Sequence, residues 1–410
     1  MSGTMKPNVV IIILDTMRAD TFRQLGERGE GQFKRVGFKP LDTCIAPSSW
    51  TLPSHASLFT GMYPKQHGAH ETTKVKSLDI DRIKLRLPTL VGDLNGMGYK
   101  SYGISANPYI HPIYGFDEFN WFKEESYFTD VFGSVFEISK GLKPLVAKYR
   151  NRLTENTESS TATMAQLMKM IGKEDPALLL NMMASGVVLT PIAAMKKLKA
   201  KFIDGWPIEK GGKNIVRELA AMKLKKPFML FVNLMEAHDP YVGKKGKDFN
   251  WATPFLKEKT PNSAIERWRT LYKAGAIKAS TYARAIVDDL AERYGDNTLF
   301  IITSDHGQGL NENGFIGHGT FLYDELVQVP FMVRLPEGGK PMGKGRYLSL
   351  TRVREFILSG LESGSFDTSM LYCKEAYAES FGVPSNLTMS ASIDKAKLKR
   401  AEKYTRRRFG

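Results

Sequence analysis

Two short apolar runs, at residues 9–14 and 299–302, are each followed by side chains that can bind a metal ion. Asp15 follows the first run directly, and Asp305 and His306 come shortly after the second. Both runs lack helical periodicity, and the first is strongly β-branched, which is typical of strands buried on both faces of a parallel sheet. In open α/β sheets, ligands bind beyond the carboxyl ends of the strands. Because a buried carboxylate without a partner is costly, these side chains predict a site for a divalent cation.

A hydroxyl group completes this set of candidate ligands. Residues 51–61, TLPSHASLFTG, predict a helix with Thr51 at its N-terminus, where the helix dipole would lower the pKa of the hydroxyl. Thr51 could alternatively act only as a helix N-cap. Two carboxylates, an imidazole and a hydroxyl favour one or two Zn²⁺ or Mn²⁺ ions, with Ca²⁺ or Mg²⁺ as the alternatives. A metal-bound Thr hydroxyl loses its proton more easily and becomes a nucleophile.

The elements that must position these groups alternate between strands and helices. Strands are expected at residues 8–15, 99–106, 227–234 and 298–304. Helices are expected at residues 16–28, 51–61, 88–97, 211–224 and 278–294. This alternation predicts the α/β class, with a doubly wound, mostly parallel sheet flanked by helices.

The domain organisation is predicted from changes in this pattern. Residues 1–339 should form the catalytic domain, interrupted by a helical insertion at about 125–210. Residues 340–410 should form a smaller C-terminal α+β subdomain with a basic tail. A helix near 350–361 and a short strand near 375–379 are expected within this subdomain.

The insertion contains a segment, residues 176–195, that carries no charged side chain and is followed by a lysine-rich stretch. One interpretation is a helical hairpin that packs on the core or forms a lid. The alternative is an interfacial helix over residues 176–201, with its basic flank on an anionic membrane. Pro191 and Gly186 argue against a regular transmembrane span.

Composition limits the remaining functions. The chain has 410 residues, of which 42% are hydrophobic, enough for a large core. Its net charge of +15 predicts anionic partners, an anionic ester substrate first among them. No nucleic-acid-binding module is recognisable, so no nucleic acid is expected. Two cysteines give no disulfide framework, and the first apolar run is too short for a signal peptide, so a cytoplasmic protein, or one held at the inner membrane face, is expected.

Six segments resemble the sulfatase branch of the alkaline phosphatase superfamily and occur in that family's order between about residues 8 and 335. They are DTMRAD at 15–20, APSSWTLPSH at 46–55, LFTGMYP at 58–64, FVNLMEAHDPY at 231–241, SDHG at 304–307 and GHG at 317–319. The resemblance implies a metal-dependent enzyme acting on esters, with Asp15, Thr51, Asp305 and His306 as the metal ligands.

The resemblance also implies roles for residues outside this ligand set. His238 would contact the transferred phosphoryl or sulfuryl oxygens, although it could instead be a histidine of the core. His318 would be the general acid for the leaving group or a ligand of a second metal ion. His55 and Asn107 would contact the substrate or support the metal ligands.

Departures from the sulfatase pattern concern the nucleophile and the sulfate-binding lysines. Sulfatases have a cysteine, converted to formylglycine, at the position of Thr51, and an arginine at that of His55. Cys44 lies nearby but lacks the arginine that conversion needs. The family's lysine is missing from residues 105–109, and His318 stands in place of a second lysine.

A threonine nucleophile is typical of the phosphodiesterases and phosphoethanolamine transferases of this superfamily, and residues 304–319 resemble the transferases closely. We therefore expect a sulfatase-family, metal-dependent hydrolase that forms a covalent Thr51 intermediate, with phosphoesters or phosphonates favoured as substrates. A true sulfuric ester hydrolase, a phospho-alcohol transferase and an inactive protein that binds anionic glycans or lipids are the alternatives.

Overall fold

The structure is a computed structural model. The described residues are 6–42, 44–70, 85, 87–107, 109–110, 114–121, 173, 176, 210–239, 241, 261–339, 343 and 345–381. The chain divides into a unit of residues 1–123 with 209–410 and a second unit of residues 124–208. The predictions for the 176–201 segment and for nearly all of the 125–210 insertion fall outside the described residues, and the domain boundaries stay predictions.

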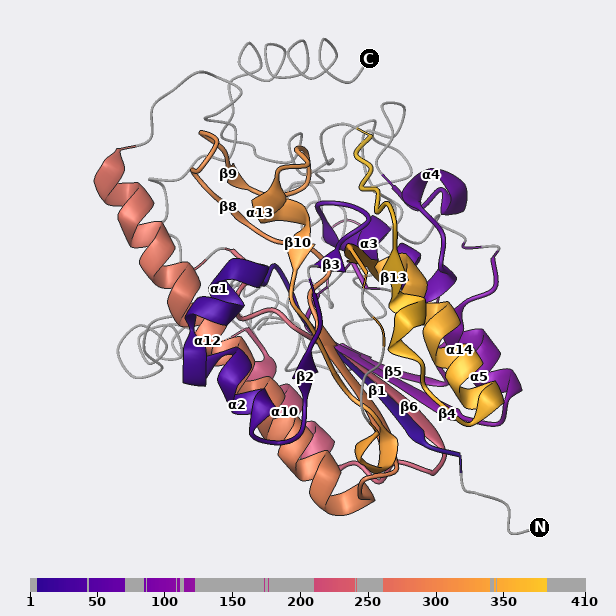
Figure 1. Cartoon of the computed structure of the whole chain (residues 1–410). Helices are drawn as coiled ribbons and strands as arrows, with labels where there is room; N and C mark the ends of the chain where they lie inside the picture. The colour runs from indigo at the N-terminus through magenta and orange to yellow at the C-terminus, as the bar shows by residue number, and fades with distance from the viewer. Residues whose placement is uncertain are drawn as a thin grey trace, which may run out of the picture. The chain divides into compact units, whose positions relative to one another are not determined.

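A seven-stranded sheet forms the centre of the first unit (Figure 1). Its strands, in spatial order, are β2 (Lys39–Pro40), β11 (Phe331–Arg334), β7 (Thr298–Thr303), β1 (Asn8–Leu14), β6 (Phe228–Leu234), β4 (Lys100–Ser105) and β5 (Glu118–Trp121). The five strands from β7 to β5 are parallel, and β11 pairs antiparallel with both β7 and β2. This confirms the predicted mostly parallel α/β sheet.

Helices cover both faces of this sheet, as the alternation of residues in β1 requires. Val10 and Ile12 belong to the core beneath α10 (Gly212–Ala221) and α12 (Asn262–Tyr294). Val9, Ile11 and Ile13 belong to the opposite core, beneath α3 (Thr51–Thr60), α5 (Leu90–Gly96) and α14 (Val353–Ser363). Every residue of β1 is buried, so the apolar side chains on both faces of this strand contribute to stability by packing into the two cores.

Two predicted helices have different bounds. The helix expected at 16–28 begins only at Ala19, because Thr16 adopts a left-handed conformation with φ of 62° and the chain turns before α1 (Ala19–Gln24). The helix expected at 278–294 is longer and starts at Asn262. The other short helices are η1 (Gly26–Arg28), α2 (Glu30–Lys34), α4 (Pro64–His67), α13 (Asp324–Val327), η5 (Pro336–Gly338), η6 (Leu350–Arg352) and η7 (Thr368–Leu371). Among the described residues, no helix combines the length and the apolar character needed to cross a bilayer.

Two smaller sheets complete the fold. One has the order β10 (Gln328–Val329), β3 (Cys44–Ile45), β12 (Tyr347–Ser349) and β13 (Tyr372–Cys373), and the other pairs β8 (Gly309–Leu310) with β9 (Ile316–Gly317). The strand predicted near 375–379 is wrong, because strand pairing ends at Cys373. The chain beyond it makes isolated bonds instead, in which the Glu379 amide donates to the Pro47 carbonyl and Ser48 Oγ donates to the Glu379 carbonyl.

Gly61 ends α3, the helix that carries Thr51, in a left-handed conformation with φ of 73°. A Cβ there would also lie 3.3 Å from the Thr351 carbonyl oxygen. We expect Gly61→Ala to lower the free energy of unfolding by about 1–2 kcal/mol in urea titrations. Gly96→Ala is the matched control, because Gly96 lies in α5 with no atom within 4 Å of its Cβ position. It should raise stability by up to about 1 kcal/mol, and equal losses in both variants would contradict this account.

Candidate active site

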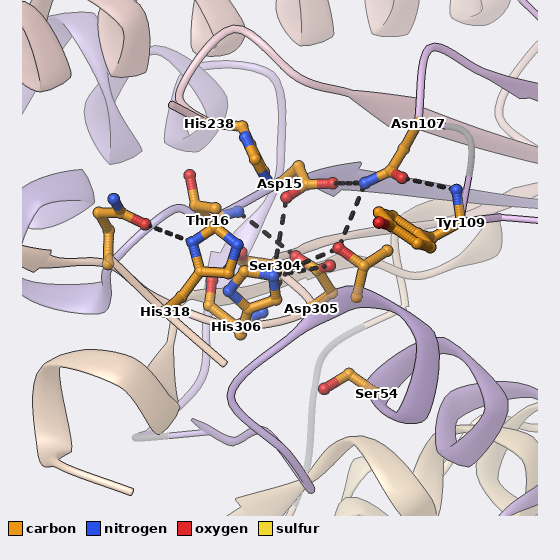
Figure 2. A network of polar contacts seen from close by, with 12 residues as sticks. Asp15, Thr16, Ser54, Asn107, Tyr109, His238, Ser304, Asp305, His306 and His318 are labelled. Carbon is orange, nitrogen blue, oxygen red and sulfur yellow. Dashed lines mark hydrogen bonds and ion pairs between the residues drawn. The ribbon is translucent and has the colours of Figure 1, made fainter. Parts of the chain in front are cut away.

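The three adjacent strands β7, β1 and β6 end at one edge of the sheet, and their carboxyl ends carry the candidate metal ligands (Figure 2). Asp15 follows β1, and Asp305 and His306 follow β7. His306 Nε2 lies 3.8 Å from Asp15 Oδ1 and 3.4 Å from Asp305 Oδ2. All three residues are at most 1% exposed. The fold therefore brings together the three residues that were predicted from opposite ends of the chain.

Thr51 joins this cluster from the N-terminus of α3. Its Oγ1 lies 3.4 Å from His306 Nε2 and accepts a hydrogen bond from Asn107 Nδ2 at 3.2 Å. Trp50 occupies the N-cap position and Thr51 is the first helical residue, so the Thr51 side chain is not the helix cap. The hydroxyl instead faces the metal-binding groups, as a nucleophile would.

Two amide side chains orient Asp15. Asn107 Nδ2 and Asn233 Nδ2 donate to Asp15 Oδ2 at 2.8 and 3.1 Å. The orientation of the Asn107 amide is fixed, because its Oδ1 accepts from the Tyr109 backbone N–H at 2.9 Å. Asn107 thus links the candidate nucleophile to a candidate metal ligand, which agrees with the supporting role considered from the sequence.

His55 lies behind Thr51 and is 1% exposed. Its Nδ1 donates to the Thr51 carbonyl oxygen at 2.8 Å and lies 3.6 Å from Asp305 Oδ2. Its ring packs edge-on against Phe231, with the centroids 5.7 Å apart. This placement makes His55 a support for the first turn of α3, and its predicted contact with a substrate stays a prediction.

The donor atoms of the cluster fit a divalent cation. Asp15 Oδ1 and Asp305 Oδ2 are buried and have no hydrogen-bond partner among the described residues. His306 Nδ1 lies 2.9 Å from the Gly307 carbonyl, which can only accept, so Nδ1 carries the proton and Nε2 keeps its lone pair. Ligand atoms from Asp15, Asp305 and His306 all lie within 4.8 Å of one another. Together with Thr51 Oγ1, they could hold one ion.

The pKa values in this cluster reflect two carboxylates buried side by side. Burial and the charge of Asp15 raise the pKa of Asp305 to about 7. Burial also opposes ionisation of Asp15, yet the neighbouring His238 and His306 and the Asn107 hydrogen bond hold its pKa below the usual value. Burial lowers the pKa of His306 to about 4, against the opposing effect of Asp15, so the ring is neutral at pH 7 and can bind a metal.

A second polar group adjoins the first. His238 Nδ1 and His318 Nδ1 each lie 3.5 Å from Asp239 Oδ1, and the rings of His306 and His318 have centroids 4.6 Å apart. Ligand atoms of His238, Asp239 and His318 also lie within 4.8 Å of one another. The fold thus brings both predicted histidines to the site, and the alternative roles of His318 both stay open.

The His318 ring is held by Gln308 Oε1, 2.8 Å from its Nδ1. Burial lowers the pKa of His318 to about 3, with the nearby His306 and His238 adding to the effect. The ring is therefore neutral at pH 7 before a substrate binds. In this state it can accept a proton, whereas donation to a leaving group needs prior protonation, which the negative charge of a bound ester favours.

Asn233, Asp239 and Gln308 take part in the site but were given no role from the sequence. Asn233 is the one polar residue of the strand sequence FMLFVNL, which is a detectable signal. Asp239 directly follows His238, and Gln308 lies two residues after His306, but neither belongs to a metal-ligand spacing, so only the fold shows what they contact.

Gly307, in the same motif as Asp305 and His306, is explained by the space around its backbone. A Cβ on Gly307 would lie 2.1 Å from the Glu325 carbonyl oxygen. The Gly307 N–H donates to the Leu326 carbonyl at 2.8 Å, which draws the two backbones together. Glycine is therefore needed here for close approach to the backbone of α13 (Asp324–Val327).

The large, mostly parallel sheet flanked by helices is a fold shared with solved sulfatase and phosphonate monoester hydrolase structures. The sequence model of the sulfatase family matches residues 7–357, and the chain belongs to this family. This confirms the resemblance recognised from the sequence. Membership supports an ester hydrolase or transferase, and the Asp15, Asp305 and His306 cluster is compatible with the divalent metal that sulfatase-family relatives use.

Individual proteins and solved structures are also similar to this chain. The low-salt glycan biosynthesis sulfotransferase of Haloferax volcanii is 32% identical over 132 residues, which span 31% of this chain and only 30% of that protein. A 2-O GAG sulfatase structure superposes with a TM-score of 0.52 at 14% identity, covering 95% of this chain and 75% of its own. The phosphonate monoester hydrolase of Agrobacterium radiobacter gives 0.50 at 15% identity, covering 87% and 74%.

The buried carboxylate pair should destabilise the metal-free protein. In Asp305→Asn, Oδ1 can still accept from the Thr16 and His306 amides, while an NH₂ group replaces the partnerless Oδ2 beside Asp15. At pH 8 we expect the free energy of unfolding to rise by about 1–3 kcal/mol and the stabilisation by added Zn²⁺ to disappear.

Asp324→Asn is the control for this variant, because it makes the same charge change at an exposed residue. Its effect on stability should stay within about 0.5 kcal/mol. A loss of stability in metal-free Asp305→Asn would contradict the account of the carboxylate pair.

Metal affinity should depend on pH through Asp305. Below pH 7 its carboxyl group keeps a proton that a cation must displace, because its pKa is raised to about 7. His306, with a pKa of about 4, does not titrate in this range. The Zn²⁺ affinity, measured by chelator competition between pH 5.5 and 8, should therefore rise about tenfold per pH unit up to pH 7 and then level off. A flat profile would contradict a protonated Asp305.

Proposed function

We propose that the protein is a divalent-cation-dependent hydrolase that acts on phosphate diesters or phosphonate monoesters through a covalent Thr51 intermediate. The observation that carries this proposal is the Thr51 hydroxyl, which lies 3.4 Å from His306 Nε2 and accepts a hydrogen bond from Asn107. A threonine ester cannot be released by hemiacetal collapse, as a formylglycine ester can. The intermediate needs direct attack by a second nucleophile, which suits phosphoryl transfer better than sulfuryl transfer.

The cation site supplies the activation of the nucleophile. Asp15, Asp305, His306 and Thr51 would hold the ion, and Zn²⁺ or Mn²⁺ suits this mixed nitrogen and oxygen set better than Ca²⁺ or Mg²⁺. A divalent cation held there would lower the pKa of the Thr51 hydroxyl and polarise the ester.

The protein residues then have distinct tasks. The Thr51 oxygen attacks phosphorus, and the Asn107 amide that donates to Thr51 Oγ1 keeps this oxygen in place. His238 would stabilise the charge on the transferred group. His318, once protonated, would donate its proton to the leaving alkoxide, and the neutral ring would then accept the proton of the water that attacks phospho-Thr51.

Transfer to an acceptor alcohol is the second candidate function. The same intermediate would be resolved by an alcohol instead of water, with His318 again accepting the proton. The similarity to the Haloferax volcanii sulfotransferase, whose name denotes transfer of a sulfuryl group in glycan biosynthesis, favours this candidate. A sulfuric ester hydrolase is the further alternative that the family allows.

The net charge of +15 supports an anionic substrate, and we keep this as part of the proposal. Peripheral contact with an anionic membrane through residues 176–201 and a place in the cytoplasm, or at the inner membrane face, also remain proposals. Loss of liposome binding on deletion of 176–201 would support the membrane contact, and no binding at low salt would end it.

The function is tested by turnover of three p-nitrophenyl esters: a phosphate diester, a phosphonate monoester and a sulfate. Each is assayed with Zn²⁺, Mn²⁺ and Ca²⁺ for the wild type, Thr51→Ala and Thr51→Ser. We expect diester or phosphonate turnover, a loss of at least about a thousandfold in kcat for Thr51→Ala, and partial activity in Thr51→Ser. Thr60→Ala, at the far end of α3, is the control and should keep wild-type turnover.

Three results decide between the candidates. Phospho-Thr51 trapped by acid quench and found by mass spectrometry would support the covalent route. Sulfate as the preferred substrate would replace the proposal with a sulfuric ester hydrolase. Turnover that appears only when an alcohol is added would establish the transferase.

A further inference from the structure

The turn that follows Asp15 is held in a conformation that its sequence disfavours. Thr16 has a φ of 62°, in the left-handed region, where β-branched residues are rare. Its own hydroxyl has no hydrogen-bond partner among the described residues, so the side chain does not stabilise this conformation. Strain of this kind persists only where the surroundings impose it.

The group that bonds to the backbone on both sides of this turn is the hydroxyl of Tyr272. It donates to the Thr16 carbonyl oxygen at 2.9 Å and accepts from the Arg18 backbone N–H, also at 2.9 Å. Tyr272 projects from α12, is 1% exposed and lies 256 residues from Thr16 in the chain. Both backbone groups are buried, so removing the hydroxyl would leave a donor and an acceptor without this partner.

The other side of the same turn contacts the second metal-binding loop. The Thr16 backbone N–H donates to Asp305 Oδ1 at 3.3 Å (Figure 2). The Met17 N–H donates to Ser304 Oγ at 2.9 Å. The turn thus connects the end of β1 with the loop after β7. Within this turn the Thr16 N–H bonds to Asp305 directly beside Asp15.

We propose that Tyr272 is a positioning residue for the metal site. Its hydroxyl fixes the left-handed Thr16 turn and thereby the relative orientation of the Asp15 and Asp305 carboxylates. Tyr272 contacts neither carboxylate, and it lies in none of the segments that resemble the sulfatase family. This inference rests on the cation site of the proposed function.

The test is the Zn²⁺ affinity of four purified proteins, measured by chelator competition at pH 7.5: the wild type, Tyr272→Phe, Thr16→Gly and the double variant. Tyr272→Phe should weaken Zn²⁺ binding about 10- to 100-fold, the range expected for a residue that orients metal ligands. Glycine adopts positive φ without strain, so the turn in Thr16→Gly no longer needs an external clamp. In that background, Tyr272→Phe should weaken binding less than about threefold.

Tyr294→Phe is the matched control. Tyr294 is the last residue of α12, and its hydroxyl accepts the Leu224 backbone N–H at 2.8 Å, so this variant also loses a hydroxyl bonded to backbone. Its Zn²⁺ affinity should stay within about twofold of the wild type. If Tyr272→Phe alone does not fold, comparing the Zn²⁺ affinities of Thr16→Gly and the double variant still tests the proposal. Glycine at position 16 removes the backbone strain against which the Tyr272 hydroxyl holds the turn.

The outcomes separate this inference from the function on which it rests. Wild-type Zn²⁺ affinity in Tyr272→Phe, an equal loss in Tyr294→Phe, or the same loss with and without Thr16→Gly would each overturn the positioning role while leaving the cation site intact. Wild-type protein that binds neither Zn²⁺ nor Mn²⁺ would overturn the cation site, and the inference with it. A loss of Zn²⁺ affinity in Tyr272→Phe that disappears in the Thr16→Gly background would establish Tyr272 as a positioning residue.

Discussion

The structure depends on the burial of two carboxylates, Asp15 and Asp305, at one edge of a parallel sheet. One oxygen of each is hydrogen-bonded, and the other has no partner among the described residues and faces the same space. Such a pair is costly without a cation, because burial and mutual repulsion act in the same direction. The fold keeps it by hydrogen bonds to the outer oxygens, so the free energy stored there favours metal binding.

Each side chain of the site is positioned by a strand, helix or loop whose own packing contacts do not involve the reacting groups. The apolar residues of β1 fix Asp15 by filling the cores on both faces of the sheet. The first turn of α3 presents Thr51, and His55 braces that turn from behind. The adjoining His238 and His318 share a carboxylate, Asp239, which ties together groups from two further loops. A rigid sheet edge thus gives precision to residues that lie on loops.

The sequence was sufficient for the four parallel strands β1, β4, β6 and β7 and for grouping Asp15, Thr51, Asp305 and His306, but not for the outer strands β2, β5 and β11. The carboxyl ends of parallel strands share one edge of the sheet. Acidic residues that follow apolar runs far apart in the sequence can therefore be predicted to lie close together. It was not sufficient for Tyr272, Asp239 or Gln308, since their contacts are made across the fold and follow no local period. The strand expected at 375–379 failed for a related reason, because a short alternating segment with one aromatic residue, Tyr377, does not by itself supply a pairing partner.

The close approach at Gly307 changes how the Asp-His-Gly triplet of this family is understood. Asp305 and His306 are candidate metal ligands, whereas Gly307 is needed because the backbone at Glu325 leaves no room for a Cβ. A search pattern built on the triplet therefore tests two unrelated properties at once. Distant relatives that repacked α13 could lose the glycine, keep the ligands and be overlooked by such a pattern.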